Sequence, residues 1–169
     1  MKPTEDLRKE HESIKRMLTI LEHVAERLEK GQEFNKQDIE KMIDFIMGFA
    51  DKCHHGKEER VLFPAMVQYG SERERKLVDF ALKDHAKGRK YVMAMAEDFV
   101  ENARNYVKLL RQHISREDTL MWPIADRIIP EEEQDGIYEE FERIEEEVIG
   151  HGKHEEYYTL LGSLEKTYL

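Results

Sequence analysis

The pattern of hydrophobic and polar positions has a helical period along almost the whole chain. Apolar residues recur three or four positions apart, which is the spacing of one face of an α-helix. The first such segment runs from about Thr4 to Lys30, and its stripe consists of Leu7, Ile14, Leu18, Leu21 and Leu28. Gly31 follows it, at the position where glycine commonly ends a helix. The pattern therefore predicts a first long helix.

Three further long helices are predicted by the same spacing. The second begins near Asn35, an N-cap residue type, and runs to about Val67, with Pro64 expected to kink or tighten its last turn. The third opens at the capping box Ser71–Glu74. The fourth contains "NYVKLLRQHISREDTLMWPIADRII" and ends before Pro130. Two shorter helices follow, separated at "IGHGK".

Four long amphipathic helices with short connections predict an all-α, antiparallel four-helix bundle. We expect residues 1–129 to form this bundle and residues 130–169 to form a C-terminal helical extension packed on it. The length of 169 residues suits a single domain.

Composition and charge exclude several partners. The net charge of −10 argues against binding to nucleic acid or anionic membrane surfaces. No apolar run reaches membrane-spanning length, there is no signal-peptide pattern, and the single Cys53 excludes an intrachain disulfide, so we expect a cytoplasmic protein.

The acidic segment 130–147 is interpreted as a solvated helix face, with a role in concentrating metal ions as the alternative.

The placement of histidines indicates where the chemistry lies, because eight is a high number for this length. On the second helix, His54 and Glu58 continue the apolar stripe, which consists of Ile43, Met47, Ala50, Val61, Leu62 and Ala65. His55 and Glu59 instead continue a polar face with Asp44, Asp51 and Lys52. The periodicity predicts that His54 and Glu58 point inward and that His55 and Glu59 face water.

The other helices also carry histidines on their inner stripes. His11 lies between Leu7 and Ile14, and His85 lies between Leu82 and Val92. His113 and Glu117 repeat the His-x-x-x-Glu spacing on a stripe with Tyr106, Leu110, Met121 and Ile124. Buried carboxylates are costly unless they are paired or bind a metal.

We therefore predict a metal site for iron, manganese or zinc. Its residues are His11, His54, Glu58, His85, His113 and Glu117. A fully satisfied polar network without metal is the alternative.

Four motifs in this order resemble the hemerythrin-like (HHE cation-binding) domain family. They are "LRKEHESI" around His11, "HHGKEERVLFP" from His54, "KDHAKGR" around His85 and "LLRQHISREDTLMWPIAD" around His113. The tail resembles the extension of longer bacterial and archaeal members. The resemblance implies a hemerythrin-type bundle that holds two non-haem iron ions.

By the same resemblance, Glu58 and Glu117 would bridge the two ions. His11 and His54 would serve one ion, and His85 and His113 the other. Oxygen-carrying hemerythrins add a histidine four residues after the third-helix ligand, where this chain has Arg89. A coordination position is thus left for water, an exogenous ligand or another side chain. His55 is a less favoured candidate for that side chain.

The connection between the third and fourth helices admits two arrangements. His85 and His113 are 28 residues apart and can share a metal only if the chain reverses near Glu97–Phe99. Asp98 is able to cap a new helix after a tight hairpin. The alternative is one continuous helix and a homodimer formed by helix swapping.

These features indicate a di-iron protein that binds a small ligand such as dioxygen, peroxide or nitric oxide, for sensing, buffering or detoxification. A di-iron enzyme of peroxidase or oxidase type and a helical interaction module with a structural metal are the alternatives. Tyr106 is a candidate to border the ligand pocket, although core packing is its commoner role.

Overall fold

The computed structural model describes all 169 residues, and every regular element in it is helical. The α-helices are α1 (Pro3–Glu29), α2 (Lys36–Phe45), α3 (Phe63–Tyr69), α4 (Glu72–Ala94), α5 (Phe99–Arg116), α6 (Trp122–Ile128), α7 (Glu131–Ile144) and α8 (Lys153–Tyr168). Four π-helical segments interrupt or extend them, at Ile46–His55, Glu58–Leu62, Glu117–Met121 and Glu145–Ile149. No helix has both the length and the apolar character needed to cross a bilayer.

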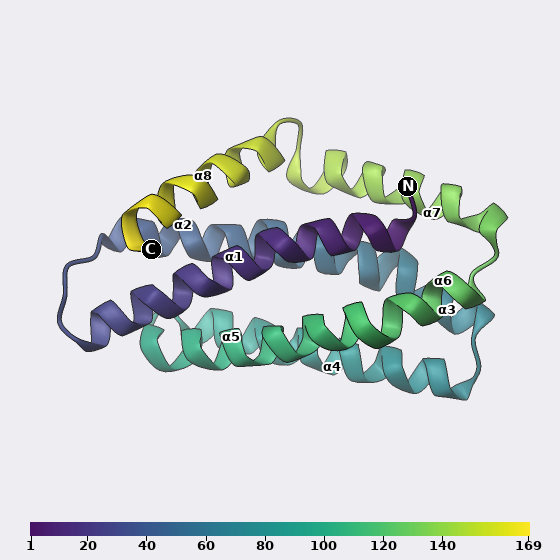
Figure 1. The fold of residues 1–169 in the computed structure, drawn as a ribbon, viewed down its shortest axis with the longest axis horizontal. Coiled ribbons are helices and arrows are strands. Elements are labelled where there is room, and N and C mark those ends of the chain that lie inside the picture. The colour runs from purple at the N-terminus through teal and green to yellow at the C-terminus, as the bar shows by residue number, and fades with distance from the viewer.

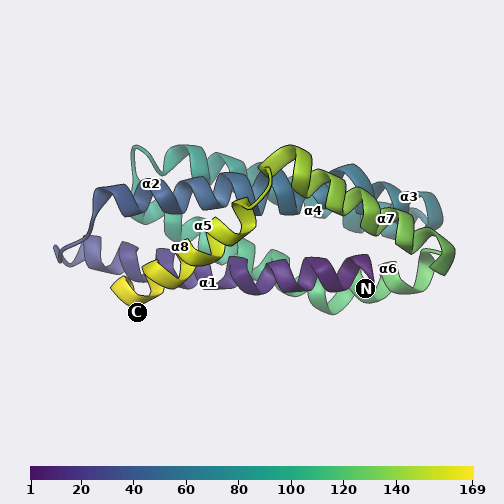
Figure 2. The ribbon, with the colours of Figure 1, turned by 90° about the horizontal axis from the view of Figure 1, so that it is seen from above.

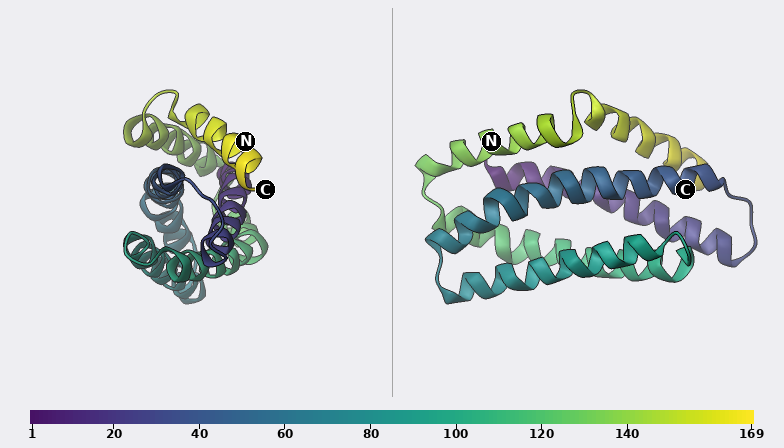
Figure 3. Two further views of the ribbon diagram at one scale, coloured as in Figure 1. Left: turned by 90° about the vertical axis from the view of Figure 1, so that its left-hand side faces the viewer. Right: turned by 180° about the vertical axis from the view of Figure 1, so that it is seen from behind.

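Four long rods lie side by side and alternate in direction, as Figure 1 and the right-hand view of Figure 3 show. The first rod is α1 and the third is α4. The second is one continuous helix through α2 and α3, residues 36–69, and the fourth joins α5 to α6, residues 99–128. The predicted all-α four-helix bundle is confirmed.

The helix boundaries follow the local signals in the sequence. The side chain of Asn35 accepts a hydrogen bond from the backbone of Gln37, which caps α2. Ser71 and Glu74 form the predicted capping box at the start of α4. Gly31 has a positive φ of 68° after α1, a conformation that glycine adopts without a steric penalty.

A tight hairpin joins α4 to α5, so the continuous helix is not formed. The backbone N–H of Asp98 donates to the carbonyl of Ala94 at 3.0 Å. The Asn102 side chain donates to the carbonyls of Asp98, at 2.7 Å, and Ala94, at 3.4 Å. Asp98 occupies the N-cap position of α5 without a side-chain cap, so Asn102 closes the turn in its place.

The C-terminal helices cross one side of the bundle, over α1 and the second rod (Figures 1 and 2). Gly150 and Gly152, both with positive φ, lie in the turn between α7 and α8. Tyr157, Leu161 and Leu164 of α8 are buried in the same apolar cluster as the inner faces of α1 and α5.

Two apolar clusters fill the bundle, and a buried polar layer separates them along each rod. The larger cluster includes Ile14, Ala50 and Leu110 and lies toward the α4–α5 hairpin. The smaller one includes Leu7 and Leu62 and lies toward α3 and α6. The histidines and glutamates of interest fall between these positions on their helices.

Candidate metal centre

The π-helical segments of the second rod turn both members of the His54–His55 pair inward. In an α-helix, neighbouring residues point about 100° apart, whereas i→i+5 hydrogen bonding adds a residue to the turn. Cys53, His54 and His55 are consequently all buried, and His55 is only 4% exposed. The prediction that His55 faces water is therefore wrong.

Two other expectations about the inner stripes are also wrong, one on the second rod and one on α4. Met47, predicted to lie on the inner stripe, is 47% exposed, and Ile46 is buried in its place. On α4, Leu82 is also exposed, while Ala81 and His85 are buried. Glu59 is partly exposed as predicted from the polar face, but its carboxylate contacts His85.

Five buried imidazoles are held in the same way, each through its Nδ1 atom. A carboxylate cannot donate, so each Nδ1–H donates to its carboxylate partner, and in the neutral ring Nε2 keeps a free lone pair. The pairs are His11–Asp118 (2.7 Å), His54–Glu10 (3.1 Å), His55–Asp51 (3.2 Å), His85–Glu59 (2.6 Å) and His113–Asp84 (3.1 Å). Metal-binding histidines are typically oriented by such a second hydrogen bond.

Glu58 and Glu117 lie among the inner nitrogens, and neither is exposed. Glu58 contacts two imidazoles, His54 Nε2 with Oε1 and His85 Nε2 with Oε2, both at 3.0 Å. Glu117 Oε1 lies 3.3 Å from His11 Nε2 and 3.1 Å from His113 Nε2. All six predicted site residues, from four helical rods, are thus brought together.

These inner contacts do not have hydrogen-bond geometry. Seven buried side-chain polar atoms in the protein lack a hydrogen-bond partner, and six of them belong to this cluster: His11 Nε2, His54 Nε2 and all four oxygens of Glu58 and Glu117. His85 Nε2 and His113 Nε2 approach to 3.2 Å, although both rings already donate through Nδ1. Lone pairs aimed at a common centre fit a bound cation.

The ligand atoms form two adjacent groups. His11, His54, Glu58 and Glu117 make up one, and His55, Glu58, His85 and His113 make up the other. Within each group the ligand atoms lie within 4.8 Å of one another. Because Glu58 belongs to both groups, the arrangement suits two neighbouring ions.

Comparison with known families agrees with this geometry. A model of the hemerythrin HHE cation binding domain matches residues 2–125, which is most of the chain. The chain belongs to this family. The resemblance expected from the four motifs is confirmed, and the HHE domain is a metal-binding domain.

Curated relatives of this HHE protein carry the name "uncharacterized protein". Proteins from Mycobacterium bovis and from two strains of Mycobacterium tuberculosis are each 23% identical to it over 175 residues. The alignments cover 96% of this chain and 69% of each relative. No solved structure matches the chain.

The electrostatics of the HHE site favour positive charge at its centre. Burial alone would lower the pKa of His54, but Glu58 and Glu10 outweigh it and raise the pKa to about 10. Glu117 and Asp84 likewise overcome burial and raise the pKa of His113 to about 10. His55 differs, because burial and the neighbouring His85 lower its pKa to about 3.

Arg89, the residue where oxygen carriers have a histidine, does not enter the cluster. Its guanidinium bridges two outer carboxylates, with Nε 2.9 Å and 3.0 Å from the oxygens of Asp51 and Nη2 2.5 Å from Glu59. Asp51 and Glu59 are the partners of His55 and His85. Arg89 therefore holds in place the two carboxylates that orient these imidazoles.

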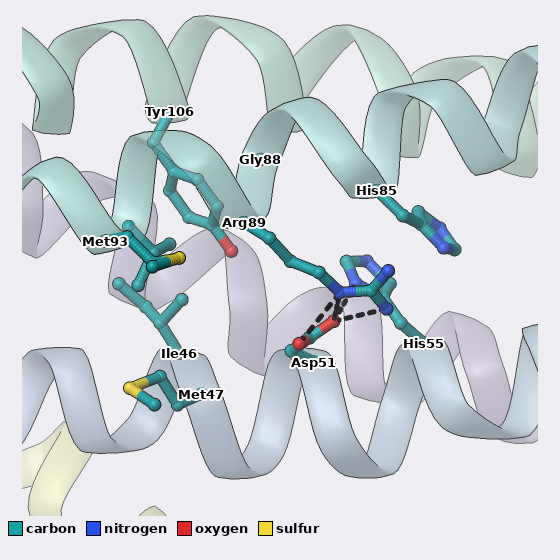
Figure 4. A pocket seen from close by; sticks show the side chains of 10 residues that line it. Ile46, Met47, Asp51, His55, His85, Gly88, Arg89, Met93 and Tyr106 are labelled. Carbon is teal, nitrogen blue, oxygen red and sulfur yellow. Dashed lines mark hydrogen bonds and ion pairs between the residues drawn. The ribbon is translucent and has the colours of Figure 1, made fainter.

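An apolar cavity of about 260 Å³ borders the cluster at His55 and His85 (Figure 4). Its other lining residues are Ile46, Met47, Asp51, Gly88, Arg89, Val92, Met93 and Tyr106. Met93 is 80% exposed, so the cavity opens to the surface there. Tyr106 is buried and borders the pocket, as the sequence suggested.

A second buried polar group lies behind His54. Lys57, which is fully buried, forms ion pairs with Asp6, Glu10 and Glu145. Glu10 also accepts the hydrogen bond from His54. Lys57 thus links the metal cluster to the C-terminal extension.

Proposed function

We propose that this chain is a non-haem di-iron protein that binds dioxygen, peroxide or nitric oxide for sensing, buffering or detoxification. One observation supports the di-iron site above all others. Buried imidazoles, each oriented by an outer carboxylate, aim their Nε2 atoms at two buried glutamates whose oxygens lack a hydrogen-bond partner. A purely structural polar network would instead satisfy those oxygens.

In this proposal, His11 and His54 hold one ion, His85 and His113 hold the other, and Glu58 and Glu117 bridge them. When bound, the iron pair supplies a redox-active centre with an open position for a small ligand. The protein fixes the tautomer of each imidazole through the outer carboxylates and keeps bulk water away by burial.

The cavity beside His55 and His85 favours a small, weakly polar ligand. Half of its lining residues are hydrophobic, and the cavity leads from the surface at Met93 toward the ligand cluster. The same cavity supports the second candidate, a peroxidase- or oxidase-type enzyme, because a substrate needs such a path.

Metal analysis of the purified protein tests the di-iron proposal. We expect two iron ions per chain and, on admitting air to the anaerobic reduced protein, an absorption change in the region of oxo-bridged ferric pairs. Glu58→Ala should remove at least one ion because it deletes a ligand common to both groups. Zinc in place of iron would support the structural-metal alternative, and catalytic consumption of hydrogen peroxide would support the enzyme.

The matched control is Glu101→Ala, on the exposed face of α5. It removes a carboxylate from a helix without touching the cluster, so iron content should stay at the wild-type level. Full iron content in Glu58→Ala would contradict the proposed site.

A further inference from the structure

His55 shares burial and an Nδ1 hydrogen bond to a carboxylate with the four predicted histidine ligands. It is buried, its Nδ1 donates to Asp51 at 3.2 Å, and its ring faces the inside of the bundle. Its ring stacks on His85 with centroids 3.8 Å apart and planes 17° apart. A ligand atom of His55 groups with those of Glu58, His85 and His113.

We propose that His55 is a fifth imidazole ligand, which completes the ion held by His85 and His113. That ion then receives three imidazoles, the ion of His11 and His54 receives two, and Glu58 and Glu117 bridge the pair as proposed above. The proposal rests on the di-iron function proposed above and specifies how its two ions differ. The ion with fewer imidazoles is then the one left to bind an exogenous ligand.

Arg89 acts in this proposal as a positioning residue. It holds Asp51 and Glu59 together, and these carboxylates fix the Nδ1 atoms of His55 and His85. Both Nε2 atoms are thereby directed into the bundle from neighbouring helices. Arg89 thus orients His55, the imidazole that replaces the histidine ligand absent at position 89.

Counting the bound imidazoles in the wild-type protein tests the proposal without a mutation. Zinc serves as a diamagnetic probe, and long-range proton–nitrogen NMR spectra of ¹⁵N-labelled protein report each ring nitrogen. Of the eight histidines, five should show a metal-bound Nε2 with Nδ1 protonated. Four such rings, with His55 unshifted by zinc, would overturn the role of His55 and leave the di-metal function standing.

Chemical rescue provides the second test. His55→Ala should weaken binding of one zinc ion about tenfold or more in a chelator competition, since even loss of an outer partner typically costs 10–100-fold. Free imidazole should restore that affinity, because the cavity lined by His55 is open to solvent and large enough for the ring. His151→Ala, in the exposed turn before α8, is the matched control and should bind both ions normally.

The outcomes separate the two proposals. If wild-type protein binds neither iron nor zinc at the centre, the proposed function fails. If wild-type protein binds two ions and His55→Ala binds them with unchanged affinities, only the role of His55 fails. Should His55→Ala not fold, the ring count in the wild-type protein decides the question.

Discussion

Each carboxylate that orients a histidine from another helix adjoins, in the sequence, a residue that faces the proposed metal centre. Glu10 adjoins His11 in the sequence but holds His54, and Asp84 adjoins His85 but holds His113. Asp118, next to Glu117, holds His11. Each of the four rods therefore supplies a residue that faces the proposed metal centre and a carboxylate that hydrogen-bonds an imidazole of another rod.

Removing one of these outer carboxylates tests this arrangement. Asp118→Ala deletes the acceptor that fixes Nδ1 of His11 at 2.7 Å. We expect the ion held by His11 to bind 10–100-fold more weakly, as measured by chelator competition, because the ring loses its fixed tautomer and orientation. Asp79→Ala, on the exposed face of α4, should change neither metal affinity nor stability; equal affinities in the two variants would contradict the role of Asp118.

Helical periodicity identified six residues that the structure brings together, but it missed His55 and the outer carboxylates. The six lie on apolar stripes, which periodicity detects directly. The carboxylates lie one residue away from such stripes, and all except the buried Glu10 are at half-buried positions that resemble solvated faces. Their adjacency to inward residues, such as Glu10 beside His11 and Asp118 beside Glu117, was the available signal.

At the scale of elements, the second rod departs most from expectation. Its ends were predicted closely, near Asn35 and Val67, because caps and glycine stops act locally. Its π-helical middle was not predicted, since a search for apolar positions at α-helical spacing does not detect a change to i→i+5 bonding. The α4–α5 hairpin was left open between two arrangements because it contains neither glycine nor proline.

Two glycines of this rod give a matched pair of substitutions. At Gly48, an added Cβ would lie 2.1 Å from the hydroxyl of Tyr157, which is buried where α8 crosses the rod. We expect Gly48→Ala to destabilise the fold by about 1–3 kcal/mol through overpacking. At Gly56 the nearest atom is 4.0 Å away and the backbone is helical.

Gly56→Ala should therefore stabilise the protein by roughly 0.5–1 kcal/mol, because alanine loses less backbone entropy in a helix. Urea unfolding followed by circular dichroism measures both changes. Similar free energies of unfolding for the two variants would show that α8 does not pack closely against Gly48.

At the scale of the whole molecule, Lys57 ties the N-terminal helix, the second rod and the C-terminal extension together. Its ammonium group pairs with Asp6 and Glu10 of α1 and with Glu145 after α7, and it lies 5.6 Å from the ring centre of Phe141. Burial would lower the pKa of Lys57, but Glu10 and Asp6 outweigh it and raise the pKa above its ordinary value. The lysine is therefore charged throughout the physiological range.

Lys57→Met should destabilise the fold by about 3 kcal/mol at pH 7, because it leaves buried carboxylates without their cation. This is the lower end of the usual range, since Asp6 and Glu145 are partly exposed. Without Lys57 the carboxylates should have raised pKa values in the folded state, so the variant should regain stability relative to wild type as the pH falls below about 6.

Chemical denaturation at several pH values measures this difference. Lys52→Met, at an exposed position of the same rod, is the control and should stay close to wild type at each pH. A Lys57→Met deficit that is constant from pH 7 to pH 5 would show that repulsion among the carboxylates is not its cause.

The π-helical turn around His55 also bears on how such chains diverge. A π turn holds one residue more than the α turn it replaces, so a single inserted or deleted codon changes which side chains face the bundle while the rod keeps its path. In related chains, side chains at the same place in the bundle can therefore come from positions that do not align in sequence. In the proposed centre the ligand absent at Arg89 is supplied by His55, and comparison of spatial positions rather than aligned columns is needed to detect such a replacement.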